Sequence, residues 1–153
     1  MANWSVSLDK YADRQKLKIK KVRRAYAFAL YSSIVKKTPV DTGRASGNWN
    51  VSVGSEDSST SDRKTPKYKS MEQMPDSNGD ESIFISNNLP YIGTLENGGY
   101  PNPPEKGTWN KKTKSYEIRS ANGYSKKASS GMVGVTLANN EAIFKAAVRS
   151  CDD

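Results

Sequence analysis

The sequence predicts one α+β domain in which a long N-terminal helix and a C-terminal helix pack on a mostly antiparallel β-sheet, with long flexible loops. Three observations predict this class: a helical periodicity over residues 7–37, short alternating runs at 49–53 and 81–87, and a second helical periodicity at 136–150. The length of 153 residues fits a single domain over the whole chain, and the 35 % share of hydrophobic residues predicts a small core.

The first helix is predicted over residues 7–37, because apolar or small residues recur every three or four positions from Leu8 through Ile19 to Ala29. Ser7 is the expected N-cap residue. The apolar stripe widens in the second half, so that half is expected to be the more buried one. At 1.5 Å per residue the helix reaches roughly 45 Å, which exceeds a core of this size, so one end is expected to project or to pack on another subunit.

Positive charge is concentrated in this helix. The formal charge is +8, and residues 1–37 carry ten basic and two acidic side chains, whereas the rest of the chain is balanced. Such asymmetry indicates either a contact surface for an acidic partner, such as DNA or an acidic protein ring, or a solvated face that keeps the protein soluble. The candidate basic surface, together with the tip of a predicted hairpin, comprises Lys16, Lys20, Arg23, Arg24, Lys111, Lys112 and Lys114.

A helix stop, a turn and a strand are predicted in TPVDTGRASGNWNVSVG, residues 38–54. Pro39 ends the helix, Asp41, Thr42 and Gly43 form a tight turn, and Arg44 is expected to bridge to Asp41 across it. The strand is predicted to face Trp49, Val51 and Val53 inward and Asn48, Asn50 and Ser52 outward.

The remaining elements follow from local patterns. Residues 55–81 are polar and are interpreted as a long flexible loop, a second strand is expected at 81–87, and a short helix at 91–97 lies between Pro90 and Gly98. Residues 99–107 are proline-rich, and 108–119 predict a hairpin with its tip at 111–114 and Trp109 against Tyr116. A last helix is predicted at 136–150 with an apolar stripe of Leu137, Phe144 and Ala147.

An enzymatic function is not expected. The chain has no histidine, and the single Cys151 therefore has no histidine to activate it. The triplet at 41–43 is similar to that of aspartic proteases, but their chemistry needs a second such carboxylate, and no phosphate-binding glycine motif occurs. We expect no catalytic residue, no cofactor and no metal site.

The main alternative from the residues alone is nucleic-acid binding, although Trp49 and Trp109 are predicted to be core aromatics rather than base-stacking ones. No apolar run approaches the roughly 20 residues of a membrane span, and the first residues lack the pattern of a signal peptide. The sequence thus predicts a soluble protein without membrane contact.

Three segments in this order resemble blocks of the neck and tail-completion proteins of tailed bacteriophages, which connect head and tail. They are residues 38–54, then ISNNLPYIGTLENG at 85–98, then NGYSKKASSGMVGVT at 122–136. The residues that carry the resemblance are Pro39, Asp41, Thr42, Gly43, Arg44 and Trp49; Asn87, Asn88, Pro90, Tyr91, Leu95, Glu96 and Gly98; and Ser125, Lys126, Gly131, Met132, Val133 and Thr136.

The resemblance implies a structural virion protein of α+β fold that assembles as a six- or twelve-fold ring. The implied partners are copies of itself, the head portal or adaptor proteins and the tail tube or tail terminator proteins, with packaged double-stranded DNA nearby. It implies location in the virion neck, and in the host cytoplasm during assembly. A non-enzymatic DNA-binding module using the basic N-terminal helix is the alternative function.

Two features depart from the family pattern. Residues 99–122 form an insertion between the second and third blocks, which we expect to contact a neighbour through its basic hairpin. Ser129 and Ser130 stand where the family tends to have a proline.

Overall fold

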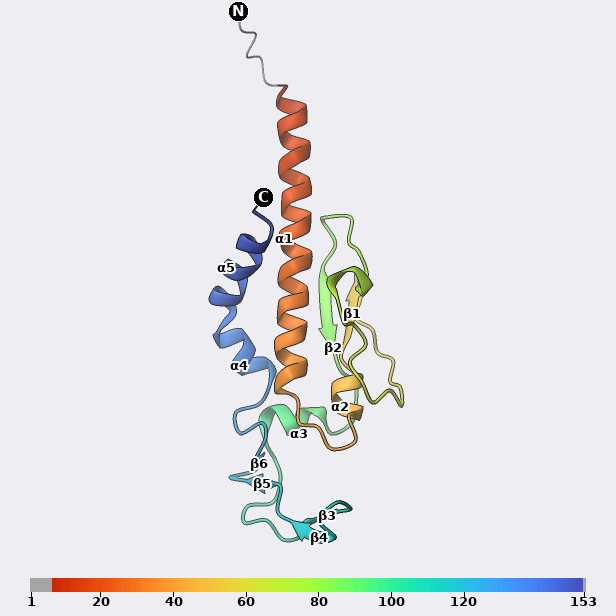
Figure 1. The fold of residues 1–153 in the computed structure, drawn as a ribbon, viewed down its shortest axis with the longest axis vertical. Helices are drawn as coiled ribbons and strands as arrows, with labels where there is room; N and C mark the ends of the chain where they lie inside the picture. Colours follow the sequence, from red (N-terminus) through yellow and green to blue (C-terminus); the bar gives the residue numbers. More distant parts are fainter. Residues whose placement is uncertain (1–6, 153) are drawn as a thin grey trace, which may run out of the picture.

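A computed structural model describes residues 7–152 and shows an elongated molecule built along one helix (Figure 1). The helix α1 (Leu8–Lys37) forms the long axis, with α4 (Val133–Ala138) and α5 (Asn140–Ser150) running back along one side. The strands β1 (Asn50–Val53) and β2 (Ile83–Ser86) lie along another side. The α+β class predicted from the sequence is confirmed.

The smaller elements gather mostly at the C-terminal end of α1 (Figure 1). They are α2 (Arg44–Gly47), η1 (Met71–Gln73, beside the middle of α1), α3 (Ile92–Asn97), β3 (Thr108–Asn110), β4 (Ser115–Glu117), β5 (Ser120–Ala121) and β6 (Tyr124–Ser125).

The bounds of α1 and its uneven burial are as predicted. The backbone N–H of Lys10 donates to Ser7 Oγ at 3.5 Å, so Ser7 caps the helix, which ends before Pro39. The N-terminal half is exposed through Ile19, whereas the C-terminal half buries Ala27, Tyr31 and Ile34. Within residues 7–152, no helix is both long and apolar enough to cross a membrane.

The strands form three separate two-stranded antiparallel ladders instead of one continuous sheet. In the largest ladder Val51 faces Ile85. In the basic hairpin Trp109 faces Tyr116, as predicted. Each described strand has four residues or fewer.

Trp109 is not a core residue. Its side chain is 46 % exposed and contacts Tyr116 edge-on, with ring centroids 5.1 Å apart. The prediction that Trp109 is buried was wrong because the hairpin lies beyond the end of α1, where no second layer covers it (Figure 1).

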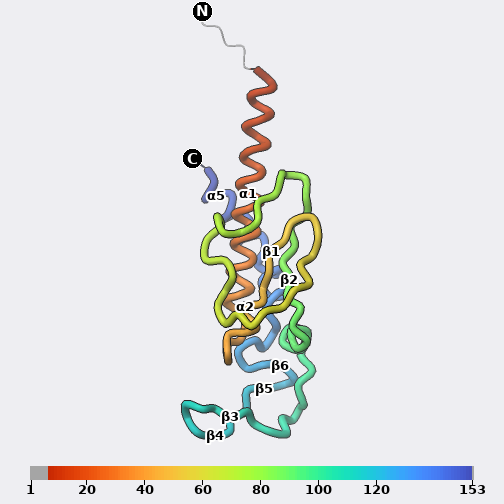
Figure 2. The backbone as a smooth tube through the Cα atoms, turned by 90° about the vertical axis from the view of Figure 1, so that its right-hand side faces the viewer, coloured from red at the N-terminus to blue at the C-terminus, as the bar shows by residue number. Residues whose placement is uncertain are grey.

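The polar segment 55–81 is irregular, as predicted, but it is packed against the rest of the chain (Figure 2). Its Tyr68 and Met74 are buried in the core. The Tyr68 N–H donates to the Tyr31 hydroxyl at 3.2 Å, and the Tyr68 hydroxyl donates to the Val51 carbonyl at 3.1 Å. Tyr68 thus ties the segment to both α1 and β1.

Asn48 and Asn50 point into the molecule, which corrects the prediction that they face solvent. Both are buried, and Asn48 exchanges two hydrogen bonds with the backbone of Ser61, at 2.7 and 2.9 Å. Asn50 accepts a hydrogen bond from Lys67. The expected polar face of the strand is therefore covered by segment 55–81, whose backbone supplies the partners that buried amides need.

The predicted C-terminal helix consists of two helices that meet at Asn139, and the first begins earlier than expected, at Val133. Of the predicted stripe, Ala147 is buried, Phe144 is 45 % exposed and contacts Tyr26 edge-on, and Leu137 is 49 % exposed. The break at Asn139 changes the direction of the stripe, so Leu137 does not continue the face that Ala147 buries.

Candidate functional site

The three segments that resemble the phage family meet at the C-terminal end of α1. Trp49 is buried, as predicted, and its Nε1 donates to Thr38 Oγ1 at 2.9 Å. Thr38 Oγ1 in turn donates to the carbonyl of Ile34 at 2.8 Å. The tryptophan therefore fixes the first segment directly beneath the last turn of α1.

The turn at 41–43 requires its glycine. Gly43 has φ +88°, and a Cβ atom there would lie 2.1 Å from the carbonyl oxygen of Lys64. The predicted Arg44–Asp41 bridge was wrong: Asp41 pairs with Arg119 at 2.7 Å, and Arg44 lies 3.6 Å from Asp62. Arg44 begins α2, and its side chain extends toward segment 55–81 rather than back across the turn.

The second segment is bonded to the first. Asn87 Nδ2 donates to the carbonyl of Ala45 at 2.9 Å, and Asn87 Oδ1 accepts from the N–H of Leu89 at 3.2 Å. Asn88 Nδ2 donates to the carbonyl of Asp57 at 2.7 Å. Asn87 thus sets the path of the chain into α3, while Pro90 remains exposed.

Glu96 joins the second segment to the third through what we call the Glu96 clasp. Its Oε2 accepts from the N–H groups of Met132 at 2.7 Å and Val133 at 2.9 Å, and its Oε1 accepts from the N–H of Gly134 at 2.8 Å. Burial raises the pKa of Glu96, but the three backbone hydrogen bonds outweigh it and hold the pKa below its ordinary value. The carboxylate caps the first turn of α4, which has no capping side chain of its own.

Glycines allow the chain segments around Glu96 to approach closely. Gly131 has φ +79°, and a Cβ there would lie 2.5 Å from the Glu96 carbonyl oxygen. Gly98 ends α3 with φ +79° and packs against the ring of Tyr124. Met132, next to Gly131, has no exposed surface.

The family-like residues therefore divide into two groups. The first is buried or bonded within the junction and comprises Gly43, Trp49, Asn87, Leu95, Glu96, Gly98, Ser125, Gly131, Met132, Val133 and Thr136. The exposed group comprises Asp41, Thr42, Arg44, Asn88, Pro90, Tyr91 and Lys126, with Pro39 in between. Most of these residues thus fix how segments 38–54, 85–98 and 122–136 pack together, an arrangement that we call the junction. The exposed group lies on the surface around the junction.

The candidate basic surface is not continuous. Lys20 pairs with Asp76 at 3.1 Å, Arg23 donates to the carbonyl of Glu81, and Arg24 donates to backbone carbonyls of segment 55–81. Lys16 is exposed on the projecting half of α1. Lys20, Arg23 and Arg24 therefore hold segment 55–81 against α1. The sequence analysis did not predict this role.

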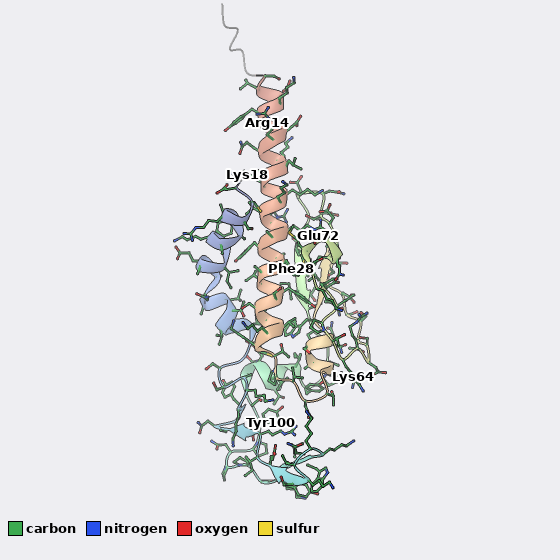
Figure 3. All side chains as sticks on the ribbon, viewed as in Figure 1. Arg14, Lys18, Phe28, Lys64, Glu72 and Tyr100 are labelled. Carbon is green, nitrogen blue, oxygen red and sulfur yellow. The ribbon has the colours of Figure 1, made fainter. Side chains whose placement is uncertain are left out.

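The projecting half of α1 and the hairpin tip are the outlying parts of the molecule. Figure 3 shows Arg14 and Lys18 on this half, beyond the level at which Glu72 lies beside the helix. Lys18 pairs with Asp152 after α5 at 2.7 Å, and both are about half exposed. Lys111, Lys112 and Lys114 are exposed at the opposite end of the molecule.

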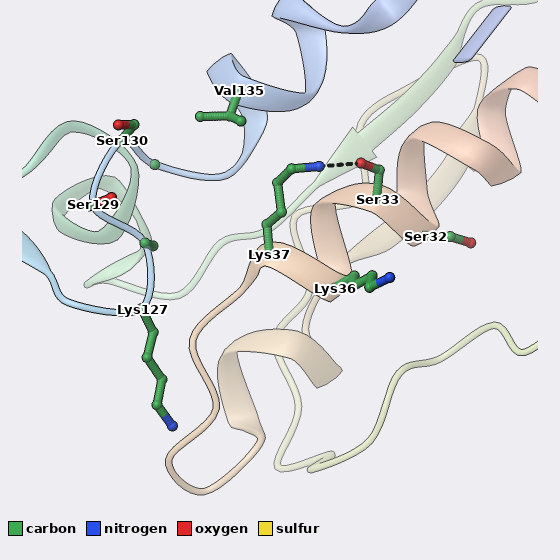
Figure 4. A pocket seen from close by; sticks show the side chains of 10 residues that line it. Ser32, Ser33, Lys36, Lys37, Lys127, Ser129, Ser130 and Val135 are labelled. Atoms are coloured by element: carbon green, nitrogen blue, oxygen red, sulfur yellow. Dashed lines mark hydrogen bonds between the residues drawn. The ribbon is translucent and has the colours of Figure 1, made fainter. Parts of the chain in front are cut away.

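A hollow of about 750 Å³ opens beside the junction, between the last turns of α1 and the chain at 127–131 (Figure 4). We call it the lysine hollow. Its lining residues are Ser32, Ser33, Lys36, Lys37, Lys127, Ala128, Ser129, Ser130, Gly131 and Val135. The sequence analysis missed it because its two walls are about 90 positions apart in the chain.

Within residues 7–152, no cluster of three or more carboxylate or thiol side chains is placed to hold a metal ion. Comparison with family models, with curated proteins and with solved structures gave no match to this chain.

Proposed function

We propose that this chain is a structural neck or tail-completion protein of a tailed bacteriophage virion, which joins the head portal complex to the tail during assembly. One observation carries the proposal: the three family-like segments, far apart in sequence, form one bonded junction. Asn87 joins the second segment to the first, and Glu96 joins it to the third. These contacts support treating the three segments as parts of one pattern.

The outlying parts suit contacts with neighbours. In the proposed six- or twelve-fold ring, the projecting half of α1 contacts the next copy, as expected for a heterologous interface that closes. The hairpin with Lys111, Lys112 and Lys114 contacts a portal, adaptor, tail-tube or tail-terminator protein, and packaged DNA lies nearby. In this proposal the protein is part of the virion neck and resides in the host cytoplasm before assembly.

Gene disruption in the parent phage tests the role. We expect filled heads separate from tails, or joined particles with unstable necks, by negative-stain microscopy, and wild-type chain supplied from a plasmid should restore joining. Infectious particles of normal yield without the chain would contradict the proposal.

A triple serine variant at Lys111, Lys112 and Lys114 tests the hairpin contact. We expect unchanged secondary structure by circular dichroism, because all three side chains are exposed, and weaker complementation of the disrupted gene. Wild-type complementation would remove the hairpin from the interface.

DNA binding by the projecting half of α1 is the second candidate, favoured by its exposed Lys10, Arg14 and Lys16. Replacing these three with serine should then weaken duplex binding and reduce the dependence of affinity on salt, because fewer phosphates are neutralised. Undetectable binding of the unmodified protein at about 50 mM salt would exclude this candidate.

A further inference from the structure

The lysine hollow carries positive charge on both of its walls. Lys36 and Lys37 come from α1 and Lys127 from segment 127–131, and serine side chains lie on the same two walls. Figure 4 shows the three lysine side chains extending in different directions, with Lys37 turned to Ser33. The ten described residues that line it include no carboxylate, no arginine and no aromatic ring. Lysine ammonium and serine hydroxyl groups are hydrogen-bond donors, so the lining is suited to an anion.

Lys37 is held in place by a chain of hydrogen bonds. Its Nζ donates to Ser33 Oγ at 2.6 Å, and Ser33 Oγ lies 3.3 Å from Thr136 Oγ1. Thr136 Oγ1 donates to the carbonyl of Met132 at 2.8 Å, so Ser33 is the donor to Thr136. An ammonium group has three donors, and this chain uses one of them.

Nearby negative charges are already neutralised by other groups. Asp41 pairs with Arg119, and the Glu96 carboxylate accepts three backbone hydrogen bonds on the far side of Gly131. The C-terminal end of α1 contributes roughly half a negative charge. Lys127 Nζ donates to the Val40 carbonyl at 3.5 Å. The hydrogen bond from Asn110 and, to a smaller extent, the charge of Lys127 lower the pKa of Glu117, a carboxylate that Arg119 also approaches to 4.0 Å. The three lysines carry more charge than Glu117 and the helix end together, so the hollow remains positive.

We propose that the lysine hollow binds an acidic peptide segment of a partner protein, through several carboxylates at once. Its lining extends over ten residues of two chain segments, which is more than one inorganic anion can contact. A stiff duplex presents its phosphates on a convex surface, and single-stranded nucleic acid is normally held by stacking on aromatic rings. A flexible acidic chain fits a concave, aromatic-free site. This inference goes beyond the proposed neck role and does not depend on it.

Fluorescence anisotropy with labelled hexaglutamate tests the proposal, with labelled hexaglutamine as the uncharged probe. We expect saturable binding of hexaglutamate alone at about 50 mM salt. A double variant, Lys36→Ser with Lys127→Ser, removes two exposed cations and should keep the fold. At about fivefold for each ammonium–carboxylate contact in water, its affinity should fall roughly twentyfold.

The matched control is Lys64→Ser with Lys69→Ser, which removes the same charge from exposed positions of segment 55–81. It should change hexaglutamate affinity less than twofold. If both double variants weakened hexaglutamate binding equally, the loss would follow from net charge alone. That result would contradict a binding site in the lysine hollow. So would the absence of saturable binding, or tighter binding of a short DNA duplex that the Lys36 and Lys127 substitutions abolish.

Discussion

Replacing Glu96 with alanine should destabilise the protein by about 1–3 kcal/mol. Loss of an N-cap side chain costs about 0.5–2 kcal/mol, and loss of a carboxylate from the positive end of a helix adds about 0.3–1 kcal/mol. The Glu96 carboxylate does both, because it accepts N–H groups of Met132, Val133 and Gly134. Because Glu96 is partly exposed, the expected loss of stability is smaller than the contribution of three fully buried hydrogen bonds to a charged group.

The stabilising effect of Glu96 should also depend on pH. Its folded-state pKa lies below its ordinary value of about 4.3, so its ionisation stabilises the fold above that pH. The contribution is lost as the pH falls from about 4.3 through the folded-state pKa. The difference in unfolding free energy between wild type and Glu96→Gln should therefore be largest at neutral pH and decrease in acid.

Urea unfolding, followed by far-UV circular dichroism, measures both effects. In thermal unfolding, the alanine variant of a chain of this length should melt roughly 2–12 °C lower. Glu105→Gln is the control, since it removes a carboxylate from an exposed position in the proline-rich segment. An unchanged urea midpoint for Glu96→Ala would contradict the stabilising role of the clasp. So would a difference in unfolding free energy between wild type and Glu96→Gln that stays constant from neutral pH to about pH 3.

Three further substitutions test the junction. Trp49→Ala should cost about 3–5 kcal/mol in urea unfolding, because the side chain is 5 % exposed; an unchanged midpoint would place it outside the core. Gly43→Ala should be strongly destabilising, since its Cβ would lie 2.1 Å from a backbone oxygen, whereas Gly93→Ala meets nothing within 4 Å and should leave the midpoint unchanged or raise it. Equal effects of the two would contradict the steric argument. Asn48→Ala should speed tryptic cleavage within 55–81, and a wild-type rate would show that Asn48 does not hold this segment.

Elements with strong local patterns were predictable from the sequence. The three- and four-residue spacing over α1, the serine before it and the proline after it are sufficient to place both ends. The alternation in β1 and β2 and the hairpin at 108–119 are equally local signals. Each depends on residues within one turn or one pair of strands.

The errors came from contacts between distant residues. Asn48 and Asn50 alternate with apolar neighbours, so periodicity places them in solvent, and only the backbone of segment 55–81 makes their burial favourable. Asp41 has an arginine three positions away, but its actual partner is Arg119. No local pattern contains these pairings.

The sequence singled out residues of the candidate site but not the contacts that they make. The resemblance gave Glu96 and Gly131, and the structure gives the reason: one supplies the cap of α4, and the other leaves room for it. The lysine hollow had no such signal, since Lys37 and Lys127 come from segments about 90 positions apart.

The uneven packing of α1 links the fold to the proposed assembly. An isolated helix of about 12 residues is marginal in water, because nucleation is costly whereas each further residue adds one hydrogen bond. The packed half, with Tyr31 and Ile34 in the core, provides the nucleus, and the exposed half extends it. That half exposes Leu8 by 81 % and Leu17 by 60 %, so burying it against a neighbouring copy removes apolar surface from water at little further cost in backbone entropy. A subunit contact on the exposed half of α1 would therefore use a helix that is already folded in the monomer. Ring formation would then require no separate folding step for the contact segment.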